Sequence, residues 1–246
     1  ITQLADIHCV STRQAQMRVY ALTGNADSVI WTGCPSIDIA KQALSEPPVT
    51  VEELGGAGAS IDLSQPFVIV LQHPVTNEIA DAAQQIDDTL EACRVYHRLQ
   101  TIVLWPGEDA GADAMSKVIR ASWQSSVHTV RNLPPSRFLR LLTQAACLVG
   151  NSSAGIREAS WLGVPVVNIG TRQQGRERGQ NVEDVDYGRT AIMNGITAQL
   201  AHGRYKGSDL YGKGTSGEKI ADVICQINKH RTIPEGLGPA AVLGQG

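Results

Sequence analysis

The chain has 246 residues, of which 42% are hydrophobic, and its 21 basic and 24 acidic side chains give a formal net charge of -3. This size predicts one large domain, or one full domain and part of another, around a real core. The balanced charge argues against nucleic-acid binding, where a basic excess is usual, and no apolar run approaches the roughly 20 residues of a membrane span.

The cysteines are dispersed and form no C-x-x-C pair. This pattern predicts reduced thiols, small buried side chains and a cytoplasmic protein. The six histidines show no metal-ligand spacing, so we expect neither a metal site nor a cofactor. The five cysteines are Cys9, Cys34, Cys93, Cys147 and Cys225.

The chain opens with Ile1 and not with methionine, and its first elements read as a strand, a helix and a strand at residues 7–11, 13–23 and 29–32. A proline-containing linker is predicted at 35–65, and its glycine-rich part, 52–60, is expected to be a loop.

Short apolar runs then alternate with amphipathic helices through residues 66–233, which predicts an α/β fold with a doubly wound parallel sheet. Ser136 is placed to cap one of the helices, and the tail 234–246 is expected to be disordered. Strands are predicted at 67–72, 101–105, 127–131, 147–149 and 165–169, and helices at 78–99, 112–123, 136–146, 155–162, 189–201 and 216–229. Ligands of such sheets bind at the carboxyl ends of the strands.

The loop after strand 147–149 carries the clearest chemical signal. It reads GNSSAG and leads into a helix, so Ser152 and Ser153 stand where backbone N–H groups are free. Hydroxyls, free N–H groups and the helix dipole together can bind an anion. Simple N-capping by either serine explains the pattern equally well.

Charged residues strengthen the anion interpretation. Glu158 follows Ser153 within the predicted helix and could accept hydrogen bonds from a ribose diol, although a solvated glutamate is the commoner case. Beyond the next strand come Arg172, Arg176 and Arg178, and guanidinium groups bind phosphate bidentately. A solvated basic loop is the alternative. The two neighbouring strand ends together favour a phosphate or diphosphate ligand.

His73 directly follows strand 67–72 and precedes Pro74. A histidine at the carboxyl end of a strand is a candidate catalytic or phosphate-contacting group, although a lone histidine is more often structural or solvated. Glu78 and Asp109 also lie at strand-end loops, where we expect them to be surface turn residues.

At this point the segment GNSSAGIREASWLGVPVVNIGTRQQGRERGQNV resembles the UDP-N-acetylglucosamine 2-epimerase family. Further blocks agree in order: HCVSTRQAQMRV, TGCPSIDIA, FVIVLQHPVTNE, WPGEDAG and NLPPSRF. The resemblance covers roughly residues 1–230. QHPVTNE and GTRQ-x-G-R favour the hydrolysing branch, which makes N-acetylmannosamine for sialic-acid pathways, over the non-hydrolysing one.

The resemblance implies two Rossmann-like domains, like those of B-type glycosyltransferases, with UDP held mostly by the second. Ser152 and Ser153 match the serines on the diphosphate, and Glu158 matches the glutamate on the ribose. Gly107 stands where the family usually has asparagine, and Lys213 replaces a usual aspartate. The remaining matches are Leu133 at uracil through its backbone, Arg172 at the phosphates and His73 in the active site, and Asp109 and Arg176 are further candidates.

The resemblance also implies the reaction and the partners. The ligands would be UDP-N-acetylglucosamine and UDP, and a homodimer is a common state in the family. The acid and base carboxylates of the family lie ahead of the region matching residue 1. The resemblance therefore implies that residues 1–34 are a remnant of the first Rossmann-like domain and that this chain supplies the UDP-binding half. A non-catalytic nucleotide-sugar-binding or regulatory module and a glycosyltransferase of similar architecture are the alternatives.

Overall fold

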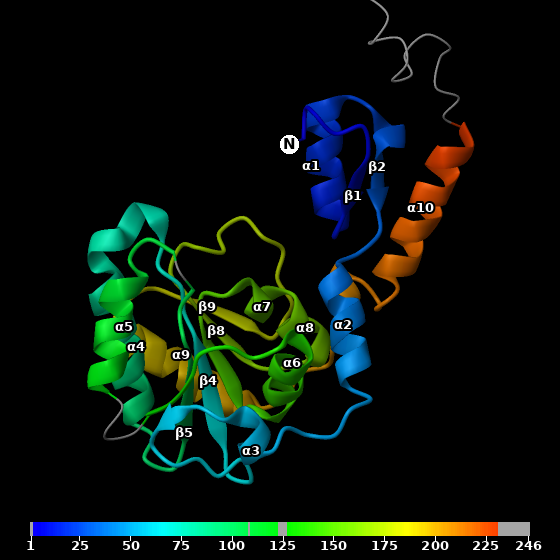
Figure 1. Cartoon of the computed structure of the whole chain (residues 1–246). Helices are drawn as coiled ribbons and strands as arrows, with labels where there is room; N and C mark the ends of the chain where they lie inside the picture. The colour runs from blue at the N-terminus through cyan, green and yellow to red at the C-terminus, as the bar shows by residue number, and fades with distance from the viewer. Residues whose placement is uncertain (1, 108, 123–126, 231–246) are drawn as a thin grey trace, which may run out of the picture.

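The computed structural model describes residues 2–107, 109–122 and 127–230. A small N-terminal unit stands apart from a larger α/β unit, and helix α10 (Ser216–His230) runs beside it (Figure 1). The small unit is a strand, a helix and a strand, as predicted, with the two strands paired in parallel. These elements are β1 (His8–Val10), α1 (Arg13–Thr23) and β2 (Val29–Trp31).

The larger unit is built on a seven-stranded sheet in the order β3-β6-β5-β4-β7-β8-β9. All neighbouring pairs from β6 to β9 are parallel, and only β3 is antiparallel. The six parallel strands follow the order of dinucleotide-binding folds, which confirms the predicted doubly wound α/β class. The strands are β3 (Ala57–Gly58), β4 (Phe67–Leu71), β5 (Gln100–Leu104), β6 (Val127–Val130), β7 (Cys147–Gly150), β8 (Val166–Ile169) and β9 (Val182–Val185).

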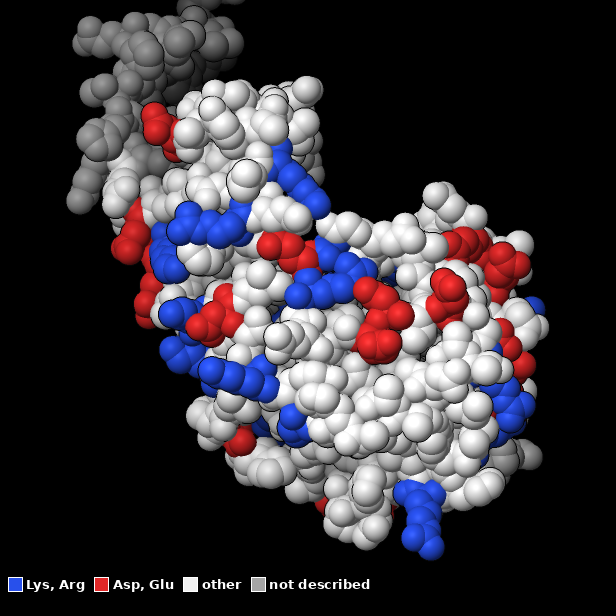
Figure 2. Space-filling view, turned by 180° about the vertical axis from the view of Figure 1, so that it is seen from behind, with Lys and Arg blue, Asp and Glu red and all other residues white. Residues whose placement is uncertain are grey.

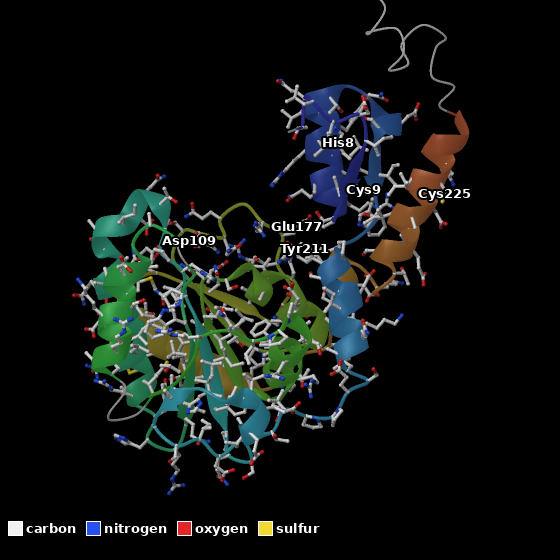
Figure 3. All side chains as sticks on the ribbon, viewed as in Figure 1. His8, Cys9, Asp109, Glu177, Tyr211 and Cys225 are labelled. Carbon is white, nitrogen blue, oxygen red and sulfur yellow. The ribbon has the colours of Figure 1, made fainter. Side chains whose placement is uncertain are left out.

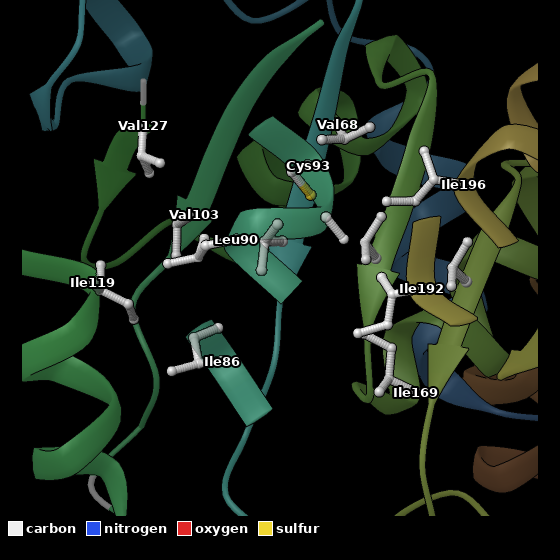
Figure 4. Close-up of a cluster of buried hydrophobic side chains, with 14 of the residues drawn as sticks. Val68, Ile86, Leu90, Cys93, Val103, Ile119, Val127, Ile169, Ile192 and Ile196 are labelled. Carbon is white, nitrogen blue, oxygen red and sulfur yellow. The ribbon is translucent and has the colours of Figure 1, made fainter. Parts of the chain in front are cut away.

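Helices cover both faces of this sheet, because alternate strand residues point to opposite sides and both sides are apolar. On one face Val68, Val70 and Val103 meet the helices α4 (Ala82–Arg94), α5 (Ala112–Ala121) and α9 (Arg189–His202), as Figure 4 shows in part. On the other face Phe67, Ile69 and Ile102 meet α3 (Val51–Leu54), α6 (Pro135–Gln144) and α8 (Glu158–Leu162). No helix in the described part of the chain has the length and apolar composition needed to cross a membrane.

The segment predicted as a linker carries more structure than expected. Helix α2 (Pro35–Ala43) packs on α6 and α8 and buries Ile37 completely. Its Asp38 carboxylate accepts hydrogen bonds from the backbone N–H groups of Ser216 (2.9 Å) and Gly217 (2.6 Å), and so caps α10. Short helices inside proline-rich sequence are decided by such tertiary contacts, which local pattern does not reveal.

Two local predictions upstream of the site are wrong. The glycine-rich segment 52–60 is not all loop, because β3 pairs with Thr129 and His128 of β6 at the sheet edge. The helix predicted at 78–99 is interrupted: Thr76–Asp81 form a 3-10 helix in which Glu78 is non-helical, and α4 ends at Arg94.

Two further predictions concern the cap of α6 and the burial of the cysteines, and one strand, β9, was not predicted. Ser136 does not cap α6, because Pro135 occupies its first turn and the Ser136 hydroxyl donates instead to Glu46 (2.9 Å). Strand β9 was missed because its glutamate and aspartate hide the apolar pattern of an edge strand. Cys34, Cys93 and Cys147 are buried as expected, whereas Cys9 and Cys225 are exposed. The tail 234–246 lies outside the described residues.

Candidate functional site

The candidate site lies where β4 and β7 stand side by side and their following chains diverge to opposite halves of the sheet. Ligands of doubly wound folds bind at this switch point. The Asn151 side chain bridges the two strand ends: its Oδ1 accepts from the His73 N–H (2.7 Å), and its Nδ2 donates to the His73 carbonyl (2.8 Å). Asn151 is 0% exposed. Its fixed position sets the distance between the His73 loop and the serine loop.

Ser152 and Ser153 stand at a helix start, as predicted, but the helix is short. Ser152 is the N-cap of α7 (Ser153–Ile156), and its Oγ accepts from the Ala154 N–H at 3.3 Å. The single helix predicted at 155–162 is broken at Arg157, and α8 begins at Glu158. A helix of four residues has only a small dipole. Positive charge for a bound anion therefore has to come from side chains.

Glu158 is the first residue of α8 and does not sit a turn inside a helix as predicted. It is only 7% exposed, and its Oε1 lies 3.4 Å from Nη2 of Arg157. Its Oε2 is buried with no hydrogen-bond partner among the described residues. A buried carboxylate oxygen in this state favours a hydroxyl donor as its partner.

The three arginines of the next loop separate in space. Arg172 is exposed and donates from Nη1 to the Asn151 carbonyl (3.2 Å), to which buried Gln173 also donates (2.8 Å). Arg178 forms an ion pair with Asp184 at 2.7 Å and donates to the carbonyl of Arg176 (2.6 Å). Arg178 therefore holds the loop, whereas Arg172 stays beside the serine loop and, among the described residues, has most of its N–H donors unpaired.

His73 lies between charged neighbours at the same edge. Burial and the positive charge of Arg172 lower its pKa, and the opposing influence of Asp109 is smaller. A cavity of about 590 Å³ adjoins it, lined by residues 74–78, Asp109, Thr171, Arg172 and Gln174. Asp109 lies at this edge of the larger unit, as do Glu177 and Tyr211 (Figure 3). The structure thus brings His73, Asp109 and Arg172 together.

The lowered pKa of His73 makes stability depend on pH. The folded protein keeps the imidazole neutral at a pH where the unfolded chain, with a pKa of about 6.5, already binds a proton. The free energy of unfolding should therefore fall as the pH drops through that value. Urea unfolding at several pH values should show a steeper loss on acidification for the wild type than for His73→Gln. Parallel curves would contradict this.

Glu78, which was expected to be a surface turn residue, is instead the centre of a hydrogen-bond cluster. Its carboxylate accepts from Thr171 (2.6 Å), Tyr187 (2.5 Å) and Gln85 (2.9 Å). The hydroxyls of Thr171 and Tyr187 lower the pKa of Glu78. The cluster fixes the start of the Arg172 loop against the 3-10 helix Thr76–Asp81. Local sequence could not reveal it, because its members lie up to 109 positions apart.

The remaining predicted residues surround this edge at different distances from the serines. Leu133 follows β6 and is partly buried against the core. Gly107 follows β5 and is exposed. Arg176 is exposed and lines a second cavity, of about 300 Å³, toward α1. Gly107 has no side chain to offer, and neither it nor Leu133 contacts the residues around Asn151 through a hydrogen bond that the structure records.

Known proteins match this architecture. The family model described as UDP-N-acetylglucosamine 2-epimerase matches residues 1–225. A UDP-N,N'-diacetylbacillosamine 2-epimerase (hydrolyzing) from Legionella pneumophila is 29% identical over 95% of this chain and 61% of its own length. A UDP-N-acetylglucosamine 2-epimerase from Neisseria meningitidis is 28% identical over 91% of this chain and 59% of its own length.

A solved structure agrees with the sequence matches. The crystal structure of UDP-GlcNAc 2-epimerase from Neisseria meningitidis bound to UDP-GlcNAc has a TM-score of 0.73 and 16% identity, and covers 92% of this chain and 62% of that one. The chain spans about three fifths of the length of the relatives it matches. It belongs to the UDP-N-acetylglucosamine 2-epimerase family.

Proposed function

We propose that this chain forms the UDP-binding half of a hydrolysing UDP-N-acetylglucosamine 2-epimerase, which converts UDP-N-acetylglucosamine into N-acetylmannosamine and UDP for sialic-acid-type sugar synthesis. One observation carries the proposal: Asn151 joins the His73 loop to the serine loop, with Arg172 and Glu158 at either side. The hydrogen-bond donors of the serine loop and the positive charge of Arg172 suit a diphosphate, and the buried carboxylate of Glu158 suits the hydroxyls of a nucleoside. The "hydrolyzing" relative from Legionella pneumophila supports the reaction type.

Each residue has a role in this proposal. The hydroxyls of Ser152 and Ser153 and the guanidinium of Arg172 bind the diphosphate, because charge-assisted hydrogen bonds to phosphate are strong. Glu158 accepts from the ribose hydroxyls through Oε2, the oxygen with no partner in the described structure. Leu133 contacts uracil through its backbone. Gly107, Asp109 and Arg176 lie at the rim of the site.

The reaction proceeds in two balanced steps. A base removes the proton on C2 of the sugar while the C1–O bond to UDP breaks, which leaves a glycal. Water then adds its hydroxyl to C1 and a proton to C2 from the other face, which gives N-acetylmannosamine. The departing UDP gains negative charge on its β-phosphate, where Arg172, the serine hydroxyls and His73 stabilise it. By resemblance, the acid and base carboxylates belong to the first domain.

The proposal is tested by titration calorimetry with UDP and an assay for release of N-acetylmannosamine. We expect the folded chain to bind UDP, and the protein that includes a complete first domain to release N-acetylmannosamine. A folded chain that does not bind UDP would overturn the proposal. UDP binding with transfer of the sugar to an acceptor, and no free N-acetylmannosamine, would indicate a glycosyltransferase instead.

A non-catalytic nucleotide-sugar-binding module is the second candidate. UDP binding without N-acetylmannosamine release by the complete native gene product would select this candidate. Intact mass of that product shows whether further residues accompany the chain.

Replacing Arg172 with alanine should weaken UDP binding without unfolding the protein. The side chain is exposed and, within the described part of the chain, donates one hydrogen bond, to the Asn151 carbonyl. Losing its charge-assisted contact to phosphate should cost roughly 1.5–3 kcal/mol of binding free energy. Titration calorimetry measures the change, and Arg98→Ala, at an exposed position between α4 and β5, is the control. Equal UDP affinities for Arg172→Ala and the wild type would argue against the assignment.

A further inference from the structure

Arg157 connects the two sides of the proposed UDP site, although the sequence pattern did not single it out. Its Nη2 donates to the Ser153 hydroxyl (3.2 Å) and lies 3.4 Å from Oε1 of Glu158. Its Nη1 lies 3.9 Å from the sulfur of Cys34, at the start of α2. One guanidinium therefore reaches the residue proposed for the diphosphate, the residue proposed for the ribose and the chain segment that leaves the small unit.

The charge of Arg157 has a physical reason to be there. Glu158 is nearly buried, and a buried carboxylate without a positive partner is strongly destabilising. The guanidinium lies against Oε1, which leaves Oε2 as the carboxylate oxygen without a partner among the described residues. The hydrogen bond from the Arg157 guanidinium to the Ser153 hydroxyl also holds the Ser153 side chain in one orientation. Because α7 has only four residues, this side chain supplies positive charge that the helix dipole cannot.

The surroundings of Arg157 bring together side chains from α1, from the loop after β8 and from the segment before α10. It lines the 300 Å³ cavity between α1 and the loop after β8, together with Arg18, Arg176 and Glu177. Arg18 closes one side by donating to the Gly175 carbonyl (2.9 Å), and Tyr211 donates to the Glu177 carbonyl (2.8 Å). Figure 2 shows basic and acidic side chains next to one another at the junction between the two units.

We propose that Arg157 is a positioning residue of the UDP site, which orients the Ser153 hydroxyl for the diphosphate and the Glu158 carboxylate for the ribose. The inference rests on the proposed function, since it needs UDP as the ligand. It adds a residue that couples phosphate recognition to ribose recognition through one planar group with several donors.

The test is a double-mutant cycle in which UDP affinity is measured by titration calorimetry. Arg157→Met keeps the side-chain length and removes the donors, and should weaken UDP binding about tenfold. In a chain that already carries Ser153→Ala and Glu158→Gln, the same change should have less than about a twofold effect, because the groups it orients are gone. If Arg157→Met still weakened UDP binding about tenfold in that background, the inference would be overturned.

Uridine provides a readout that a merely structural role would not produce. In the Glu158→Gln background, Arg157→Met should weaken binding of UDP but not of uridine, because only the Ser153 contact remains. In the Ser153→Ala background, it should weaken both ligands, because only the ribose contact remains. Equal losses for both ligands in both backgrounds would indicate a general structural effect and contradict the proposal.

Two controls distinguish a loss of folding or a failure of the proposed function from a failure of the role proposed for Arg157. Thermal unfolding without UDP checks that each variant folds; if Arg157→Met does not fold, the cycle is measured with Arg157→Lys, which keeps the charge but loses the fork of donors. Arg98→Met, at an exposed position on the opposite edge of the sheet, should bind UDP like the wild type. Wild-type protein that does not bind UDP would refute the proposed function, whereas normal binding by Arg157→Met would refute only the role of Arg157.

Discussion

Replacing Gly150 with alanine is expected to lower the free energy of unfolding by about 4 kcal/mol, because backbone strain and overpacking add at this position. Gly150 has a φ of +138°, which side-chain-bearing residues rarely adopt. A Cβ there would press against the carbonyl of Leu71, its partner in the neighbouring strand β4. Backbone atoms of a central sheet cannot move aside as a flexible side chain can. Urea unfolding measures the loss.

Gly188→Ala is the matched control for this variant. Gly188 also has a positive φ, +101°, but a Cβ there would meet no atom within 4 Å. Gly188→Ala should therefore lower the free energy of unfolding only by the backbone strain, about 1 kcal/mol. Similar losses for the two variants would show that close approach of β4 and β7 is not what requires glycine at the start of the serine loop.

Replacing Asn151 with alanine should lower the free energy of unfolding by about 3 kcal/mol, because the partly buried N–H and carbonyl of His73 both lose their hydrogen-bond partner. The Asn151 side chain is the group that both bind, at 2.7 and 2.8 Å. With this bridge gone, the His73 and serine loops are free to separate, and UDP affinity should fall together with stability. Chemical denaturation and calorimetry measure the two effects.

Asn194→Ala, on the exposed face of α9, serves as the control and should change stability by less than about 0.5 kcal/mol. An Asn151→Ala protein as stable as the wild type would show that the two loops hold their positions independently. A destabilised variant that still binds UDP with full affinity would show that the bridge supports the fold but not the ligand.

The alternating pattern of buried strands and amphipathic helices determined the fold class from sequence alone. Runs such as FVIVLQ are apolar on both faces, and only a sheet covered by helices on both sides buries them. From that class follows the edge at which ligands bind, so His73, Ser152 and Arg172 could be chosen before any coordinates were known. Their grouping around Asn151 agrees with this reasoning.

Only the tertiary structure decided the local details of the site and of the predicted linker, because these details depend on contacts between residues far apart in the chain. The hydrogen-bond cluster around Glu78 depends on Tyr187, which lies 109 positions further along the chain. Helix α2 forms inside the predicted linker because Ile37 is buried in the core and Asp38 accepts a hydrogen bond from the first residue of α10. The break at Arg157, which turns one expected helix into two, places its guanidinium between Ser153 and Glu158. Local propensity carries no information about such long-range packing, whereas periodicity carries enough to set the class of fold and the edge of the sheet where its site lies.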